Sequence, residues 1–323
     1  MTHSVREITQ RVRQESGFVQ ALINETGKII VGQEKLVRRM LIALLSDGHM
    51  LIEGVPGLAK TLAVRTLAAT INAQFQRVQF TPDLLPSDLI GTQIYNPGTH
   101  DFSAHPGPIF SNLVLADEIN RAPAKVQSAL LEAMEERQVT IGDESFKLHP
   151  LYMVLATQNP IEQEGTYPLP EAQLDRFMFM IKLDYPKFAD ELEVIKKTTS
   201  ELGENPSVVI SKDSILNYQQ LIRKVPVADN VFEYAVNLVA KTRPNGEKAS
   251  QLAIDYLEWG AGPRAGQFLI LAAKCNALIN GKYSPDMEDI RAVAIPVLRH
   301  RIVRNFKAEA EGITEEKIIK DLL

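Results

Sequence analysis

The stretch that decides the fold runs from His49 to Thr61 and reads H-M-L-I-E-G-V-P-G-L-A-K-T. Its first five residues contain neither glycine nor proline and are mostly apolar, which predicts a buried strand. Gly54 and Gly57 then form a short loop, in which Pro56 fixes one φ angle and Gly57 is free to adopt a positive φ. From Lys60 onward the apolar residues recur with a helical period. The segment therefore predicts a strand, a glycine loop and a helix.

A strand, a glycine loop and a helix that opens on Lys-Thr make a cradle for phosphate. Backbone N–H groups and the positive end of the helix face an anion, Lys60 reaches the β- and γ-phosphates, and the Thr61 hydroxyl binds Mg²⁺. Ala59 stands where the usual pattern G-x-x-x-x-G-K-[ST] has its last glycine, and we expect it to enter the helix in the right-handed region. A short glycine loop can also simply connect a strand to a helix. The residues expected to contact the nucleotide here are Gly54, Val55, Pro56, Gly57, Leu58, Ala59, Lys60, Thr61 and Leu62.

Composition limits the class of protein. The 323 residues, 45% of them hydrophobic, are enough for one large domain or two ordinary ones. The net charge of −5 gives no overall basic field for nucleic acid or an anionic membrane. The single cysteine, Cys275, excludes an internal disulfide and suggests a reducing compartment. Because no apolar run is long enough to span a bilayer, we expect a soluble, cytoplasmic protein.

Two adjacent carboxylates end a second apolar run. Residues 112–120 read N-L-V-L-A-D-E-I-N, which predicts a buried parallel strand that delivers Asp117 and Glu118 at its carboxyl end. Open α/β sheets bind their ligands at that edge. We expect Asp117 to act in the outer sphere of Mg²⁺ and Glu118 to polarise the attacking water. The alternative is a strand end with two solvated acids, which Lys60 and Thr61 make less favourable.

A third apolar strand, L-Y-M-V-L-A at 151–156, leads into T-Q-N-P. Asn159 would lie on the same edge as Asp117 and could bind the γ-phosphate or the water. Arg176 follows a short helical segment, L-P-E-A-Q-L-D-R-F, and precedes a last strand at 179–183.

The other segments before residue 186 have less specific patterns. Residues 4–24 are periodic enough for an amphipathic helix, and 75–80 alternate like a strand. The turn 29–34 is expected to cap a helix at 35–45; alternatively, Val31 and Gly32 wrap the nucleotide base. A helix at 123–137 presents Glu132, Glu135 and Glu136, expected to be solvated or to face another subunit, and residues 138–148 predict a hairpin.

Residues 81–108 form a long segment with no regular periodicity, unusual in a compact domain unless it has a function. His100 and His105 lie within it without a carboxylate cluster, so we expect solvated residues rather than metal ligands.

The pattern changes after Tyr185-Pro186, where strand signals stop and helical signals begin. We expect an α/β domain at 1–186 and a smaller all-α domain at 187–323, with helices near 187–201, 212–223, 228–241, 264–280 and 286–298. Arg264 stands at a helix start, where a cation opposes the helix dipole, so we expect it to face a phosphate. The basic run of Arg299, Arg301, Arg304 and Lys307 is expected to be a solvated face, with only weak support for nucleic acid contact.

Taken together, these motifs resemble those of the AAA+ ATPases, and more narrowly the MoxR family within the helix-2-insertion clade. The motifs that carry the resemblance are V-G-Q-E, G-V-P-G-L-A-K-T, L-A-D-E-I-N-R-A, A-T-Q-N-P, L-P-E-A-Q-L-D-R-F and G-P-R-A, between about residues 31 and 306. Ala59 departs from the general P-loop but agrees with the MoxR form. The fold implied is an AAA+ P-loop core, a parallel sheet flanked by helices, with a smaller all-α lid.

The resemblance also implies roles for single residues. The loop with Lys60 and Thr61 would be Walker A, Asp117 and Glu118 would be Walker B, and Asn159 would be sensor 1. Arg176 would be the arginine finger that reaches the neighbour's γ-phosphate, and Arg264 would be sensor 2. Residues 81–108 look like the helix-2 insertion and 138–148 like the pre-sensor hairpin.

MoxR-type proteins form rings, commonly hexamers, and are chaperone-like ATPases that use ATP and Mg²⁺. They act with partners that carry a von Willebrand factor A domain. The chain lacks that domain's D-x-S-x-S pattern, so we expect a separate partner polypeptide, together with a protein substrate. The resemblance leaves open remodelling, maturation, and metal or cofactor insertion. The alternatives are a DNA translocase, which the acidic net charge disfavours, and a magnesium-chelatase-like motor subunit.

Overall fold

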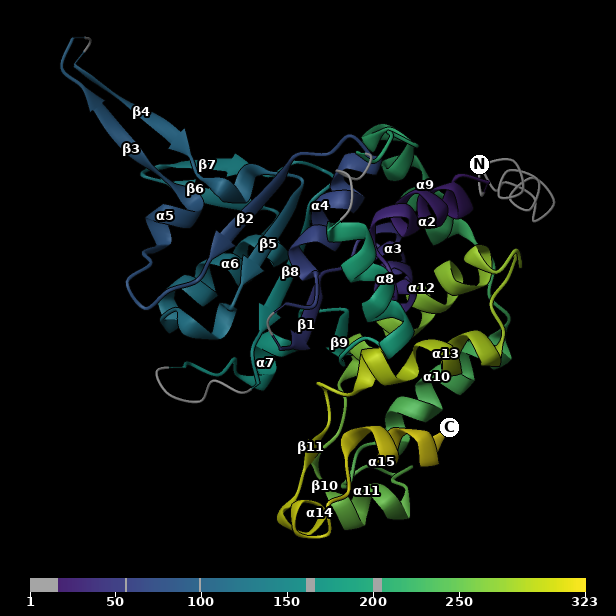
Figure 1. Ribbon diagram of the computed structural model, residues 1–323. Coiled ribbons are helices and arrows are strands. Elements are labelled where there is room, and N and C mark those ends of the chain that lie inside the picture. Colours follow the sequence, from purple (N-terminus) through teal and green to yellow (C-terminus); the bar gives the residue numbers. More distant parts are fainter. Residues whose placement is uncertain (1–16, 56, 99, 161–165, 200–204) are drawn as a thin grey trace.

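A five-stranded parallel sheet forms the centre of the computed structural model, which describes residues 17–55, 57–98, 100–160, 166–199 and 205–323 (Figure 1). The strands are β1 (Met50–Gly54), β2 (Phe75–Gln79), β5 (Leu113–Asp117), β8 (Met153–Gln158) and β9 (Phe179–Leu183). Their order in the sheet is β2-β5-β8-β1-β9, and all neighbouring pairs are parallel. The carboxyl ends of the strands therefore share one edge, and the predicted α/β fold is confirmed.

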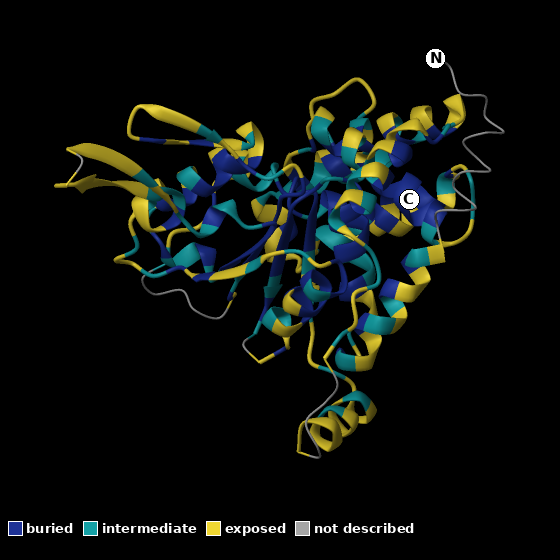
Figure 2. Cartoon of the chain, turned by 90° about the horizontal axis from the view of Figure 1, so that it is seen from above, coloured by how far each residue is buried: buried dark blue, intermediate teal, exposed yellow. Residues whose placement is uncertain are grey.

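Both faces of the centre of the sheet are buried, and the central strands are largely dark blue in Figure 2. In β5, Leu113 and Leu115 belong to one apolar core, while Val114 and Ala116 belong to the other. The first core also contains α2 (Gly17–Ile29), α3 (Glu34–Leu45) and α4 (Lys60–Thr70), and the second contains α6 (Ala124–Glu136). Burial on both faces explains why the central strands β1, β5 and β8 have continuous apolar sequences, whereas the edge strand β2 alternates.

The predicted amphipathic helix at 4–24 lies partly outside the described residues, which begin at 17. Within them, α2 extends beyond the predicted end, to Ile29. Val19 and Leu22 are buried in the first core, so this helix packs on the body of the domain.

The segment 81–108 has regular structure, although its sequence has no regular periodicity. The segment contains the short helix α5 (Pro86–Ile90) and a hairpin of β3 (Gly91–Asn96) and β4 (Asp101–Pro106), and it leads into the 3-10 helix η1 (Pro108–Phe110). Most residues of the hairpin are exposed, and it projects from the body of the molecule (Figure 1). Because solvent reaches both of its faces, the hairpin lacks the alternation of apolar and polar residues that identifies a half-buried strand.

The hairpin predicted at 138–148 is confirmed as β6 (Gln138–Ile141) and β7 (Glu144–Lys147). Its turn contains Gly142, whose φ of 64° lies in the left-handed region that favours glycine. The remaining short elements before residue 186 are the 3-10 helix η2 (Ile119–Arg121) and the helix α7 (Glu171–Leu174).

The part of the chain after β9 is mostly helical, as predicted. Its helices are α8 (Phe188–Thr199), α9 (Lys212–Lys224), α10 (Asp229–Lys241), α11 (Gln251–Tyr256), α12 (Pro263–Ile279), α13 (Met287–Leu298), α14 (Phe306–Ala310) and α15 (Glu315–Leu322). An all-α composition is nevertheless incorrect, because β10 (Leu257–Trp259) pairs with β11 (Val303–Arg304). None of the described helices combines the length and apolar character that a membrane crossing requires.

One basic residue joins the helical part to the sheet domain. The prediction that the run 299–307 is a solvated face is wrong for Arg301, whose side chain is only 1% exposed. Its Nε donates to Asp175 Oδ1 at 2.7 Å, and its terminal nitrogens donate to backbone carbonyls that include those of Asp175 and Phe177. Burial lowers the pKa of Arg301 to about 10, so the guanidinium stays charged at neutral pH. Arg301 thus anchors the segment after α13 to the end of α7.

Candidate nucleotide site

The phosphate cradle predicted from the sequence lies between β1 and α4. Gly57 has a φ of 85°, which a glycine adopts without strain, and α4 begins at Lys60. The prediction that Ala59 is right-handed is wrong: its φ is 56° and its ψ is 23°. Ala59 is the N-cap of α4, and the sharp turn into the helix needs a left-handed residue, for which the general pattern uses glycine. Pro56 lies outside the described residues.

The predicted contacts converge on a cavity of about 420 Å³ at the carboxyl edge of the sheet. Its lining contains Gly54, Gly57, Leu58, Ala59, Lys60, Thr61, Leu62, Arg77, Asp117, Glu118, Thr157, Gln158 and Asn159. Three predicted contacts, Val31, Gly32 and Val55, are not among these lining residues. A Cβ on Gly32 would lie 2.7 Å from the side chain of Asp190, so α8 packs closely against this turn. The structure thus groups the cradle with both carboxylates and Asn159, but not with the turn at residue 32.

Lys60 has a defined position in this cavity. Its Nζ donates to the carbonyl oxygen of Gly54 at 2.6 Å, which holds the ammonium group across the loop. Burial lowers the pKa of Lys60, and the nearby carboxylates Asp117 and Glu118 oppose that shift. The position suits a cation that meets the phosphates of a nucleotide.

The two carboxylates at the end of β5 are held by different groups. Asp117 Oδ2 accepts from Nε and Nη2 of Arg77, at 2.9 and 2.6 Å, and Asp117 Oδ1 accepts from Oγ1 of Thr157 at 2.5 Å. Glu118 Oε2 accepts from Gln79 Nε2 at 2.7 Å and from Arg121 Nη1 at 3.0 Å. Glu118 also has a left-handed backbone, with a φ of 56°, which turns it away from the strand direction of Asp117. The two acids are therefore oriented separately, as two different roles require.

Four residues of the site were not predicted from the sequence: Arg77, Gln79, Arg121 and Thr157. Arg77 and Gln79 are two residues apart in β2, and β2 pairs with β5 so that Gln79 lies opposite Asp117. The alternation of the strand sequence F-Q-R-V-Q-F places both side chains on one face. Their partners could not be identified from that pattern, because a single sequence does not give the order of strands in the sheet.

Thr157, in β8, contacts the carboxylate of Asp117 and the backbone of Glu118. Its hydroxyl donates to Asp117 and accepts from the backbone N–H of Glu118 at 2.9 Å, and the residue is 1% exposed. We expect Thr157→Val to lower the rate of ATP hydrolysis by about tenfold or more. Thr157 orients Asp117, and the loss of a group that orients a metal-binding carboxylate typically costs about 10–100-fold in activity. The partly buried N–H of Glu118 would also lose its partner, at a cost of up to about 1–3 kcal/mol of stability.

Thr157→Ser is the matched control, since it keeps the hydroxyl and removes only a methyl group. Steady-state phosphate release and urea unfolding of both variants measure the two effects. Wild-type turnover in Thr157→Val would contradict this role for Thr157.

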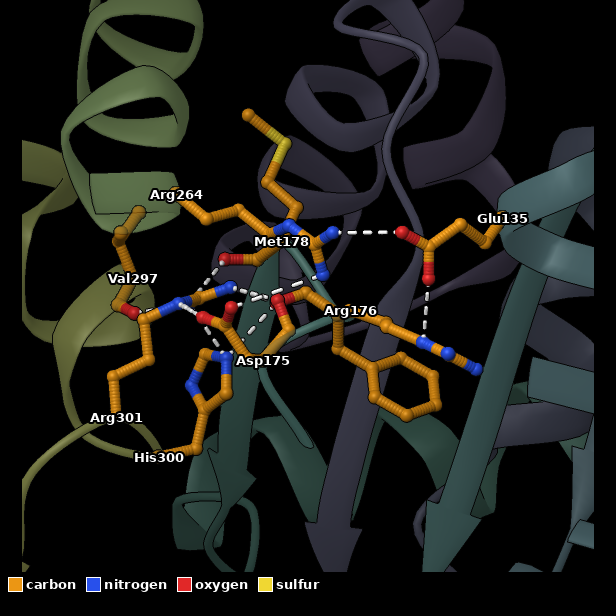
Figure 3. Close-up of polar contacts among 9 residues, drawn as sticks. Glu135, Asp175, Arg176, Met178, Arg264, Val297, His300 and Arg301 are labelled. Atoms are coloured by element: carbon orange, nitrogen blue, oxygen red, sulfur yellow. Dashed lines mark hydrogen bonds and ion pairs between the residues drawn. The ribbon is translucent and has the colours of Figure 1, made fainter. Parts of the chain in front are cut away.

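Arg176 and Arg264 lie together but outside the lining of this cavity (Figure 3). Both contact Glu135 of α6: Arg176 Nε is 2.7 Å from Oε2, and Arg264 Nη2 is 2.8 Å from Oε1. Arg264 Nη1 lies 3.7 Å from Oδ2 of Asp175. Pro263 occupies the first turn of α12, as predicted. Arg264 was expected to face a phosphate; within the described part of the chain, the anions beside it are the carboxylates of Glu135 and Asp175. Glu135 was expected to be solvated or subunit-facing; it is 39% exposed and paired with both arginines.

The other residues of the basic run also have partners. Arg299 Nη2 lies 2.9 Å from Glu316, Arg304 Nε lies 2.7 Å from Glu315, and the Lys307 ammonium group lies 5.0 Å from the centre of the Tyr256 ring. The run therefore contributes to contacts within the chain rather than forming a continuous basic face.

Comparison with known proteins gives matches across most of the chain. Residues 49–179 match the family described as "ATPase family associated with various cellular activities (AAA)", and residues 249–322 match "AAA lid domain". "Chaperone MoxR1" of Mycobacterium tuberculosis is 46% identical over 93% of this chain and 80% of its own. "Protein MoxR" of Methylorubrum extorquens is 30% identical over 93% of this chain and 90% of its own. A crystal structure from Cytophaga hutchinsonii, described as a candidate ATPase, has 47% identity and a TM-score of 0.90, with coverage of 99% of this chain and 96% of that one.

Proposed function

Because this chain belongs to the MoxR family of AAA+ ATPases, we propose that it hydrolyses ATP at the interfaces of a homo-oligomeric ring and uses that hydrolysis to remodel a protein partner. Nucleotide binding and ATP hydrolysis follow from membership of the family. The ring, Mg²⁺, the roles of single residues and the partner are the proposal.

The observation that carries the proposal is the separation of two sets of residues in one chain. The cavity beside β1 contains the lysine and the two acids, whereas Arg176 and Arg264 lie together elsewhere. Arg77, which does line the cavity, is paired with Asp117. Arg176 is 31% exposed and Arg264 is 36% exposed, so a second copy of the chain can reach both. A heterologous ring contact would bring them to the nucleotide of the neighbouring subunit.

Within the cavity, each residue has a proposed task. Lys60 and the loop N–H groups bind the β- and γ-phosphates, and Glu118 accepts a proton from, or polarises, the attacking water. Asn159, 7% exposed at the end of β8, orients the water or the γ-phosphate. From the neighbour, Arg176 stabilises charge on the γ-phosphate as an arginine finger, and Arg264 acts as sensor 2.

The residues present fit a magnesium ion. Thr61 and Asp117 both line the cavity and offer oxygen donors, which Mg²⁺ prefers. We propose that Thr61 holds the ion directly and Asp117 in the outer sphere. When bound, Mg²⁺ would neutralise charge on the phosphates.

We base the proposed assembly, partner and substrate on the family to which the chain belongs. The relative named as a chaperone suggests action on protein substrates, and we propose a hexameric ring that works with a separate von Willebrand factor A domain protein.

We propose a nucleotide-binding domain at 1–186 and a lid at 187–323. The buried free Cys275 suits a reducing compartment, which supports a cytoplasmic location. The exposed hairpin β3–β4 is the element we propose for partner contact. The proposal includes maturation of a complex and insertion of a metal or cofactor as forms of that remodelling.

The alternatives gain no support. A DNA translocase needs a basic surface, and Arg299, Arg301 and Arg304 are paired within the chain, which carries a net charge of −5. No particular contact among the described residues favours a magnesium-chelatase-like role.

The proposal predicts that ATP hydrolysis per subunit depends on protein concentration. If the site is shared, dilution below the concentration at which the ring assembles should lower the specific activity, and concentration should raise it to a plateau. Phosphate release and sedimentation velocity on the same dilution series measure both quantities. A flat specific activity across a range in which the oligomer dissociates would contradict a shared site.

A further inference from the structure

One carboxylate in this structure holds two arginines that come from different parts of the chain (Figure 3). Glu135 lies in the last turn of α6, Arg176 follows α7, and Arg264 is in the first turn of α12. Each carboxylate oxygen of Glu135 contacts one arginine: Oε2 contacts Arg176 Nε at 2.7 Å, and Oε1 contacts Arg264 Nη2 at 2.8 Å. Glu135 therefore connects a residue of the sheet domain with a residue of the helical part.

The contact with Arg176 has a particular geometry. Glu135 engages Nε, and in Figure 3 the outer end of the Arg176 guanidinium points away from the other labelled residues. The terminal nitrogens are the fork that can bind two oxygens of a phosphate. A carboxylate on Nε thus fixes the side chain without covering the part of it that would meet a phosphate.

The charges of the cluster support the same interpretation. Arg264 lies near the positive end of α12, which disfavours a cation, and the carboxylates of Glu135 and Asp175 offset that effect. Glu135 is 39% exposed, and ion pairs at such exposure contribute little to stability. Stabilising the fold is therefore a weak explanation for a carboxylate that bridges two arginines at the surface.

We propose that Glu135 is a positioning residue for ATP hydrolysis, which holds Arg176 by Nε and ties it to Arg264 so that both guanidinium groups meet the neighbour's nucleotide together. The inference rests on the proposed function, in which both arginines act across a subunit interface. Arginine side chains have many rotamers, and fixing them before the phosphate arrives reduces the ordering needed in the transition state. The bridge also makes the position of Arg176 depend on the position of the lid.

The test is Glu135→Gln, assayed at a protein concentration on the plateau of specific activity. We expect kcat to fall about tenfold, because misplacing a positioned group by about 1 Å can cost up to about a hundredfold in rate. The KM for ATP should change by less than about twofold, because the nucleotide binds in a cavity that Glu135 does not line. Glu136→Gln, one residue further along α6 and exposed, is the matched control and should leave both constants unchanged.

A double-mutant cycle separates positioning from a general effect on structure. In an Arg176→Ala background, Glu135→Gln should cause no further loss, because the group that it positions is already absent. A second cycle with Arg264→Ala measures the link to the lid and should also show coupling. Sedimentation velocity on each variant establishes that the ring still forms.

Three results would overturn the inference. An increase in kcat for Glu135→Gln would mean that the carboxylate competes with the phosphate for the arginines. An unchanged kcat would mean that Arg176 needs no such support, and equal losses with and without Arg176 would mean a structural role for Glu135. If Arg176→Ala and Arg264→Ala themselves keep full activity, the proposed shared site fails first, which distinguishes the two failures.

Discussion

Glu118→Gln is expected to bind ATP with close to wild-type affinity and to hydrolyse it at least about a hundredfold more slowly, because a positioned general base contributes about 10²–10⁴-fold. The substitution keeps the size of the side chain and an oxygen that can accept from Gln79 and Arg121. It removes the negative charge that we propose polarises the water. Binding should persist because Lys60 and the loop N–H groups are unchanged.

Two assays on the same preparation separate these effects. A fluorescent ATP analogue measures affinity, and phosphate release measures turnover. Glu132→Gln, an exposed carboxylate on α6 outside the cavity lining, is the control for the loss of one negative charge. Full turnover in Glu118→Gln would refute the assignment of Glu118 and leave Asp117 as the carboxylate to test next.

Arg176→Ala is expected to retain ATP binding and to lose about a thousandfold or more in kcat, the effect that arginine fingers have in phosphoryl transfer. The physical reason is that a guanidinium stabilises charge on the transferring phosphoryl group without titrating. Binding should be spared because Arg176 does not line the cavity of its own chain. The phenotype would thus resemble that of Glu118→Gln, although the two residues lie in different places.

Arg291→Ala provides a control with the same change of side chain. Arg291 is 41% exposed, pairs with Glu288 within α13, and lies outside the cavity lining. Its loss should leave kcat within about twofold of wild type, as for most substitutions of surface residues. Wild-type turnover in Arg176→Ala would mean that this residue is not a finger.

The cradle and the sheet could be predicted because each depends on local sequence. The apolar runs, the glycines and Lys60-Thr61 identify a strand, a turn and a helix within a few residues of one another. The parallel sheet then follows from the alternation of strands and helices. Asp117, Glu118 and Asn159 lie at one edge because every strand runs in the same direction.

Most of the errors concern features that depend on residues far apart in the chain. Arg301 was expected to be solvated because it belongs to a basic run, but contacts with residues 175–178 bury it. Arg77 and Gln79 were not recognised because their partners, Asp117 and Glu118, lie at the end of β5, about 40 residues away, and the strand order is a tertiary property. The error at Ala59 is local. The general pattern has a glycine at this position, and that glycine already indicates a left-handed backbone, which Ala59 adopts.

The most direct test of a shared site is to mix two inactive variants, Glu118→Gln and Arg176→Ala, under conditions that allow subunits to exchange. Each lacks a different half of the site, so an Arg176→Ala cavity beside a Glu118→Gln neighbour has all its groups. In a ring with random order and equal amounts, about a quarter of the interfaces meet that condition. We predict that turnover returns toward about a quarter of the wild-type rate, while each variant alone stays inactive. Turnover in the mixture that stays at the level of the separate variants, with exchange shown by labelled subunits, would contradict the account.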